Sequence, residues 1–188
     1  MKVGYSTAVT LAILTLLCAP SVGMAQESTQ GGTRFTAHGD FRGTRFYEDR
    51  AWLAGGGIGL KVGPSSRIGL FGFGTASPSL YGTLEFHLAY GGIRLEQDVW
   101  RSGRLGTAVA VSGGGGRFWN KVGQSGIELR TGVGVVEPEF LFGVDIGDHL
   151  RASTTLSYRW VTGIEGDILN RSDGDVRGIT LGLRLGVR

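Results

Sequence analysis

Charged side chains recur at every second position in several stretches of this chain, with apolar or small side chains between them. Glu137, Glu139 and Asp145 alternate in this way with the apolar residues of the stretch 136–146. Because successive side chains of a β-strand point to opposite faces, this pattern predicts strands with one charged face and one apolar face. Opposite charges on one face can form ion pairs or select ions, and a histidine beside a nucleophile would add hydrolytic chemistry.

The pattern is clearest in the stretch 133–162, which predicts a β-hairpin. Pairing Ile146 with Leu150 leaves residues 147–149 as the connection, a common hairpin length. In that register Phe140 opposes Leu156 on the apolar face, and a slip by one residue would mix the two faces. The charge pairs expected on the other face are Asp145 with Arg151 and Glu137 with Arg159.

The N-terminal segment has the order of a secretory signal. Lys2 precedes an apolar run over residues 8–19, and small residues lead to a cleavage site after Ala25. We therefore predict a signal peptide over residues 1–25 and a single domain over residues 26–188. The only cysteine, Cys18, lies within the signal, so no disulfide is expected.

The rest of the chain predicts eight strands. Their expected ranges are 34–45, 52–62, 67–75, 85–99, 105–118, 133–146, 150–162 and 176–187. In the third range Ile68 and Leu70 alternate out of phase with Phe71 and Phe73, which requires either a β-bulge or inward-facing phenylalanines. The connections after the second, fourth and sixth strands are short. Those after the third, fifth and seventh are longer, notably residues 119–130 and 163–175, and the first, residues 46–50, is intermediate.

Alternating short and long connections are typical of outer-membrane barrels. The tryptophans agree: Trp52, Trp119 and Trp160 are expected near the outer rim and Trp100 near the inner rim, as an aromatic girdle. We therefore predict an all-β protein, an eight-stranded antiparallel up-and-down transmembrane β-barrel. It would be a monomer in the outer membrane of a diderm bacterium, in contact with outer-membrane lipid and inserted by the barrel assembly machinery.

The charged faces are expected to line the lumen. The predicted lumen charges are Asp40, Arg42, Lys61, Arg94, Glu96, Asp98, Glu137, Glu139, Asp145, Arg151, Arg159 and Arg184, with His38 beside them. Six acids against six bases favour a salt-bridged plug over a selective ion pathway, which would need a ring of one sign. An eight-stranded barrel has an interior that side chains can just fill.

Other chemistry has weaker support. The chain has 19 Lys and Arg against 16 Asp and Glu and no clustered basic face, so nucleic acid is not an expected partner. Neither 57–59 nor 113–116 precedes a helix that could bind a phosphate, and 173–175 lacks the spaced oxygen ligands of a calcium loop. His38, His87 and His149 have no marked nucleophile beside them. No catalytic residue, cofactor or metal is therefore expected.

Three segments resemble a family of small outer-membrane β-barrel proteins of diderm bacteria. They are residues 90–96 (YGGIRLE), 136–139 (VEPE) and 157–163 (SYRWVTG). The resemblance implies a signal peptide, eight strands and no assigned activity or catalytic residues. Two features depart from the usual barrel pattern: the chain ends in Arg188 rather than an aromatic residue, and Pro138 lies within a strand. Proline removes a ladder hydrogen bond, so we expect a bulge there or a position near the outer rim.

The sequence thus favours a non-enzymatic barrel with a mostly closed lumen and a structural or surface-binding role through its outer loops. Three alternatives remain at this stage. They are a narrow porin-like channel for ions or small solutes, a lipid-modifying enzyme that uses His38, and a soluble periplasmic barrel that carries a ligand.

Overall fold

The computed structural model describes residues 35–46, 49–77, 79–81, 84–122, 127–164 and 176–187. The predicted signal peptide, residues 1–25, lies outside these ranges. The strands are β1 (Phe35–Phe46), β2 (Asp49–Lys61), β3 (Ser66–Ser77), β4 (Ser79–Tyr81), β5 (Leu84–Ser102), β6 (Leu105–Val122), β7 (Ile127–Ile146), β8 (Leu150–Thr162) and β9 (Gly178–Val187). The described residues include no helix long and apolar enough to cross a membrane.

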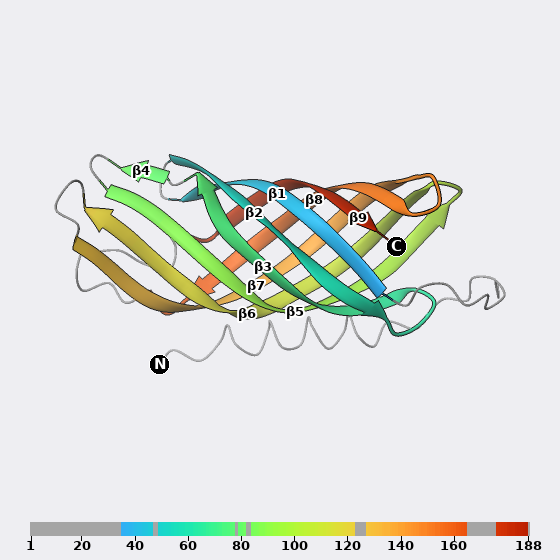
Figure 1. The fold of residues 1–188 in the computed structure, drawn as a ribbon, viewed down its shortest axis with the longest axis horizontal. Coiled ribbons are helices and arrows are strands. Elements are labelled where there is room, and N and C mark those ends of the chain that lie inside the picture. Colours follow the sequence, from blue (N-terminus) through green and yellow to red (C-terminus); the bar gives the residue numbers. More distant parts are fainter. Residues whose placement is uncertain are drawn as a thin grey trace, which may run out of the picture. The chain divides into compact units, whose positions relative to one another are not determined.

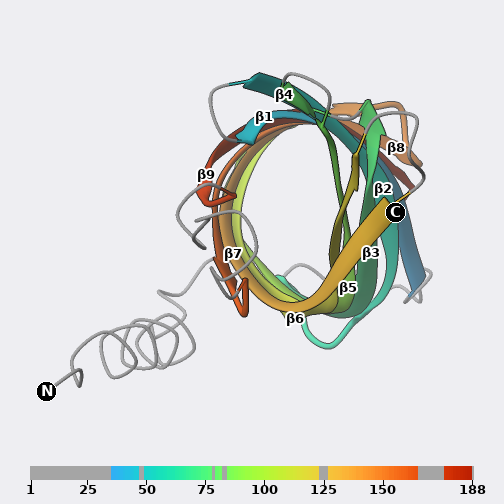
Figure 2. The same ribbon diagram turned by 90° about the vertical axis from the view of Figure 1, so that its left-hand side faces the viewer.

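Eight of these strands form a closed antiparallel barrel. Each pairs with its neighbours in the order β3-β2-β1-β9-β8-β7-β6-β5, and β3 pairs with β5 to close the ring. The short β4 pairs with β5 beyond the end of β3. The strands are tilted along the barrel in Figure 1, and the view from one end in Figure 2 shows the ring. The predicted fold class is confirmed, because the pairing of β3 with β5 joins the two edges of the eight-stranded sheet.

Side chains alternate between the two faces of the wall as predicted. Along β9, Leu181, Leu183 and Leu185 are exposed, whereas Thr180 and Arg184 are buried in the interior. Along β8, the buried and exposed residues alternate without interruption from Ser153 to Thr162. The outer surface of the barrel is therefore apolar along these strands.

The sequence left open whether the third strand contains a β-bulge or turns its phenylalanines inward, and the structure shows the second arrangement. Phe71 and Phe73 are buried, while Ile68 and Leu70 are exposed on the outside. The pairing of β3 with β5 keeps one register from Ser66 to Gly74, so no bulge is needed.

The hairpin register is confirmed. Ile146 pairs with Leu150 and Phe140 pairs with Leu156, and Gly147 takes a positive φ of 68° in the turn. The ladder between β7 and β8 stops after Val136 and resumes at Glu139 in the same register. Pro138, which has no N–H to donate, lies in this gap near the middle of β7. The predicted bulge or rim position was wrong, because the two positions of β7 without a partner on β8, Glu137 and Pro138, are tolerated without a change of register.

Several boundaries differ from those predicted. The loop expected over 119–130 is mostly strand, since β6 continues to Val122 and β7 begins at Ile127. The first connection is reduced to residues 47–48, because Phe46 already pairs with Asp49. β5 continues to Ser102 past an irregularity between Asp98 and Trp100. In each case the apolar alternation fades before the strand ends, but backbone pairing does not depend on apolar side chains.

Candidate functional site in the barrel interior

The middle of the interior is filled by an ion-pair cluster centred on Glu139. Its carboxylate accepts hydrogen bonds from Arg42 Nη2 at 2.9 Å, from the hydroxyl of Ser112 at 2.8 Å and from Arg94. Arg184 Nη2 lies 3.5 Å from the same carboxylate. Glu139 has no exposed side-chain surface, and Arg42 has none either. Strands β1, β5, β7 and β9 each contribute a charged group to this cluster.

Glu137 forms the second centre of the cluster. It accepts hydrogen bonds from Arg42 Nη1 at 2.9 Å, from the hydroxyl of Tyr90 at 2.8 Å and from Ser157. Arg42 therefore bridges the two glutamates of β7 from the opposite strand β1. Tyr90 was absent from the residues predicted for the lumen, although it shares the inward face of β5 with Arg94.

Asp40 and Glu96 complete the charge pairing around Arg184. The Nε of Arg184 donates to the two oxygens of Asp40 at 2.9 and 3.1 Å. Its Nη1 donates to Glu96 at 3.1 Å, and Arg94 Nη2 lies 3.2 Å from Glu96. Buried charges are tolerated when each has such partners. The arrangement fits a salt-bridged plug.

The end of the barrel with the short connections carries a looser set of charges. Arg67, which was not predicted for the lumen, pairs with Glu96 and with Asp98 at 2.6 Å. Arg67 shares a face of β3 with Phe71 and Phe73. An inward assignment of the two phenylalanines would therefore have placed Arg67 in the lumen as well. Asp145 pairs with Arg101 at 2.9 Å and lies 4.0 Å from Arg151, its predicted partner. Lys61 makes no ion pair within the described residues.

The predicted pair of Glu137 with Arg159 does not form. Arg159 instead donates to the hydroxyl of Thr44 at 3.0 Å and to the carbonyl of Val176 at 3.3 Å. Its guanidinium lies 5.0 Å from the centre of the Phe46 ring, a cation–π distance. Arg42 reaches Glu137 from across the lumen and takes the position that strand pairing had assigned to Arg159.

The interior toward the opposite end, where the longer connections lie, is mainly apolar, which the alternation of charged residues did not predict. Its buried members are Phe46, Ala51, Leu53, Phe71, Phe73, Phe86, Leu88, Tyr90, Phe118, Val133, Val135, Val161 and Val176. We call this set the aromatic layer. Phe73 stacks on Tyr90 at a centroid distance of 5.6 Å, and the guanidinium of Arg42 lies 4.1 Å from the centre of Phe73. The aromatic layer thus lies directly against the ion-pair cluster, and both fill the lumen.

Glycines opposite these rings allow the layer to pack. Gly55 pairs with Phe73, and a Cβ atom added to Gly55 would overlap its ring. Gly116 pairs with Tyr90, and a Cβ there would lie 2.6 Å from the tyrosine Cβ. The rings lie against bare backbone, a known way of covering glycine in a sheet.

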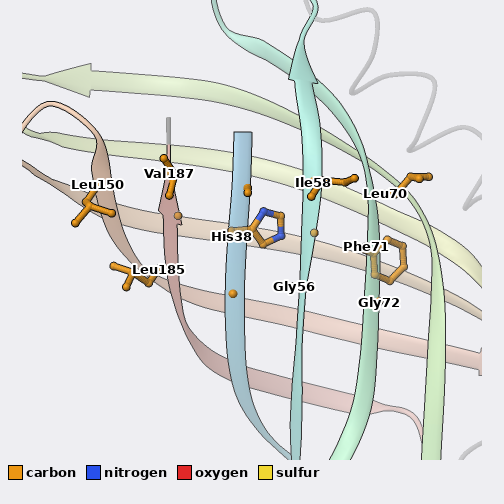
Figure 3. A pocket seen from close by; sticks show the side chains of 13 residues that line it. His38, Gly56, Ile58, Leu70, Phe71, Gly72, Leu150, Leu185 and Val187 are labelled. Atoms are coloured by element: carbon orange, nitrogen blue, oxygen red, sulfur yellow. The ribbon is translucent and has the colours of Figure 1, made fainter. Parts of the chain in front are cut away.

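Two hollows accompany the site. A cavity of about 70 Å³ at the end with the short connections is lined by His38, Arg67, Arg94, Glu96 and Arg184, among others. A larger hollow of about 550 Å³ lies against Leu185 and Val187 on β9, Ile58 on β2 and Leu70 on β3 (Figure 3). Those four side chains are exposed on the outer face, so the larger hollow is a groove on the outside of the barrel.

No histidine in the described part of the chain is hydrogen-bonded to a hydroxyl. Nε2 of His38 lies 3.3 Å from Asp40, but no described hydroxyl makes a hydrogen bond to the ring. His87 stacks on Trp119 at 5.2 Å, and His149 lies in the turn between β7 and β8. The described residues contain no group of His, Cys, Asp and Glu suited to a metal ion.

The four tryptophans of the predicted girdle lie on the outer face. Trp52, Trp100 and Trp160 are exposed, and Trp119 is partly exposed. Trp52 stacks on Phe41 at 5.1 Å, and Trp160 contacts Tyr158 at 4.6 Å. The tryptophans therefore lie on the apolar outer surface, whereas the rings of the aromatic layer lie in the interior.

Solved structures share this architecture. The structure of Neisserial surface protein A superposes with a TM-score of 0.58 at 8% identity, over 81% of this chain and 94% of that one. This chain has the fold of a small outer-membrane β-barrel. The attachment invasion locus protein Ail of Yersinia pestis is also similar, with a TM-score of 0.49 at 7% identity over 81% of this chain and 95% of that one. No protein-family model and no curated protein matches the chain.

Proposed function

We propose that this protein is a non-enzymatic outer-membrane barrel with a closed lumen, which serves a structural or surface-binding role. In this proposal the end with residues 47–48, 78–83, 123–126 and 163–177 faces the outside of the cell. The end with the short turns faces the periplasm.

The outer face supports the membrane location. Leu181, Leu183 and Ile179 on β9 are more than 60% exposed, which is costly in water but favourable in lipid. The charged and polar groups are instead collected in the interior. A soluble barrel that carries a ligand would have the reverse arrangement, with an apolar lumen and a polar surface.

Replacement of Leu183 by arginine tests this location. Leu183 lies in the middle of β9, opposite Phe41 and Thr154. Arginine on a lipid-facing site near the bilayer centre is expected to cost about 2–4 kcal/mol of stability. Reversible urea unfolding of the barrel in phospholipid vesicles measures this cost. The matched control is Val62→Arg at the end of the barrel, with an expected cost of about 0–1 kcal/mol. Equal small costs at both sites would argue for a surface in water.

The packing of the interior supports a closed lumen, and the functional proposal depends on it. The ion-pair cluster and the aromatic layer follow one another along the barrel, and an ion would have to pass both. Glu139 and Arg42 have no exposed side-chain surface, so the cluster leaves no open path beside them. Because the described residues show neither an open path nor a catalytic group, the proposal assigns the activity to the outer surface and the connections.

Planar-bilayer conductance tests closure. We expect the wild-type barrel to conduct no ions, because an ion would have to cross both the ion-pair cluster and the aromatic layer. The single variants Arg42→Ser and Phe73→Ser should remain silent or nearly so, since each leaves one layer in place. The double variant removes the contact that joins the two layers and should conduct. Retention of the heat-modifiable mobility of folded barrels on gels confirms that each variant is folded, and Asp148→Asn in the exposed turn serves as the control.

Steady conductance by the wild-type protein would contradict the closed lumen and favour the narrow channel. Selectivity measurements with the same variants would then show whether the lumen charges choose the ion.

A further inference from the structure

The cavity of about 70 Å³ at the end with the short connections has a strongly basic lining. We call it the basal cavity. All eight strands of the barrel contribute residues to its lining, so it lies within the ring. Its charged lining residues are Arg67, Arg94, Arg151 and Arg184 and, among the described carboxylates, Glu96. A hollow that is lined mainly by charges of one sign concentrates ions of the opposite sign, which here are anions.

The four arginines come from opposite walls of the barrel. Arg67 on β3 and Arg94 on β5 lie on strands that pair with each other. Arg151 on β8 and Arg184 on β9 lie on another such pair. Two strands separate these walls on each side of the ring, β1 with β2 and β6 with β7. Guanidinium groups therefore approach the basal cavity from opposite directions.

Most of the carboxylates that contact these arginines do not line the basal cavity. Each lies within 4.0 Å of one of the four guanidinium groups, and they are Asp40, Asp98, Glu139 and Asp145. None of these four is part of the lining. The carboxylates thus contact the arginines from outside the cavity, and N–H groups that they leave free are available to a ligand inside it.

Arg151 has fewer partners than the other three. Its side chain is only 13% exposed, yet it makes no hydrogen bond to a described residue, and its Nε lies 4.0 Å from Asp145. The guanidinium lies against Gly106 and Gly143, where an added Cβ would come within 2.8 and 2.6 Å of its nitrogens. A guanidinium has five N–H donors, and leaving them without acceptors inside a protein is costly. The basal cavity must therefore supply acceptors to Arg151, as water or as an anion.

We propose that the basal cavity binds one small tetrahedral oxyanion, phosphate or sulfate, with Arg151 as its main donor. At about 10–15 Å³ for each water, a cavity of about 70 Å³ has room for roughly five to seven waters or for an ion of similar size. Arginines are the preferred donors to phosphate oxygens. Their approach from two walls suits four oxygens in a tetrahedral arrangement better than the single plane of a carboxylate.

The basal cavity is open toward the end of the barrel and closed toward its middle. Arg67 and Arg151 keep 14% and 13% of their side chains exposed. Arg94 and Arg184 keep only 4% and 6%, and both belong to the ion-pair cluster. An anion can enter past the first two and stops at the last two. Binding therefore requires no passage through the lumen, and in the proposed orientation the anion comes from the periplasm.

Isothermal titration calorimetry of the full chain, refolded in maltoside micelles, tests the site. Phosphate, sulfate, acetate and chloride are titrated separately at neutral pH and constant ionic strength. We expect saturable binding of one phosphate or sulfate per barrel. Acetate and chloride should bind at least about tenfold more weakly, because they accept fewer charge-assisted hydrogen bonds.

Replacement of Arg151 by glutamine should weaken phosphate binding about tenfold or more, since hydrogen bonds to a charged donor are lost. The matched control is Arg104→Gln, in the exposed turn at the same end, because Arg104 does not line the basal cavity. It removes the same charge and should bind phosphate within about twofold of wild type. A second variant, Ala108→Leu, keeps every arginine and enlarges a side chain of the lining, so it should also weaken binding.

The midpoint of heat unfolding in the same micelles gives a second readout. Phosphate should raise the midpoint of the wild type and of Arg104→Gln but not that of Arg151→Gln, because a ligand that binds only the folded state stabilises it. This comparison separates a loss of binding from a failure to fold.

Four results would each overturn the proposal. They are the absence of saturable phosphate or sulfate binding, equal binding of chloride, unchanged affinity of Arg151→Gln, and an equal loss of affinity in Arg104→Gln. Tighter binding of glycerol 3-phosphate than of phosphate would also overturn it, since the site would then belong to the phosphate group of a larger molecule. These results leave the membrane location and the closed lumen untouched, because the Leu183→Arg variant and the conductance measurement test those separately.

Discussion

Replacement of Glu139 by leucine is expected to lower the stability of the barrel by about 3–5 kcal/mol, the usual cost of removing one partner from a buried ion pair. Glu139 accepts hydrogen bonds from Arg42 and Arg94 and lies within 3.5 Å of Arg184. Leucine would remove the carboxylate that these three buried cations share and would leave Arg94 with Glu96 as its remaining described carboxylate partner. Reversible urea unfolding in phospholipid vesicles, followed by tryptophan fluorescence, measures the loss.

The control for this prediction is Asp148→Asn in the exposed turn, which should change stability by less than about 0.5 kcal/mol. A second variant, Glu139→Leu combined with Arg94→Met, removes a cation along with the carboxylate and should recover part of the loss. A loss below about 1 kcal/mol for Glu139→Leu would show that water reaches the cluster. The ion-pair cluster would then be hydrated, although the structure gives its central side chains no exposed surface.

Replacement of Phe73 by alanine should cost about 3–5 kcal/mol, the range observed when a buried aromatic ring leaves a cavity. Phe73 stacks on Tyr90 at 5.6 Å and packs against Phe71 at 6.0 Å, and the guanidinium of Arg42 lies over its ring. Its pairing partner Gly55 has no side chain that could fill the space. The same unfolding measurement in vesicles applies.

The matched control is Phe140→Ala, at an outward position that is 47% exposed. Lipid chains can occupy the space left by that ring, so its loss should cost clearly less than the loss of Phe73. Equal costs at the two positions would indicate that the aromatic layer is loosely packed. They would also weaken the argument that the lumen is closed at that end.

The charged residues of the lumen could be predicted from strand alternation, but their partners could not. Alternation placed Glu137, Glu139 and Arg159 on the inward face, where they lie. The pairing of Glu137 with Arg159 was inferred from the hairpin alone, which contains only two strands. Arg42 is 95 residues away from Glu137 in the sequence and reaches it across the lumen. Contacts of this kind depend on closure of the barrel.

The aromatic layer was missed for a related reason. An inward-facing phenylalanine has the same local pattern as a lipid-facing one, so Phe86 and Phe118 could not be assigned where no charged side chain two residues away marked the inward face. The long loop expected over 119–130 was wrong because polar residues were taken as a sign of a connection. Asn120 is instead buried in the interior at the end of β6.

By itself, the sequence determined which residues alternate, how the central hairpin is registered and where the short turns lie. These properties follow from the period of two and from turn chemistry, which act over a few residues. Only the tertiary structure decided that Arg42 joins both glutamates of β7 and that aromatic rings fill one end of the lumen. The physical reason is that ring closure brings together strands that are distant in the chain, and the resulting cross-lumen distances select which side chains meet.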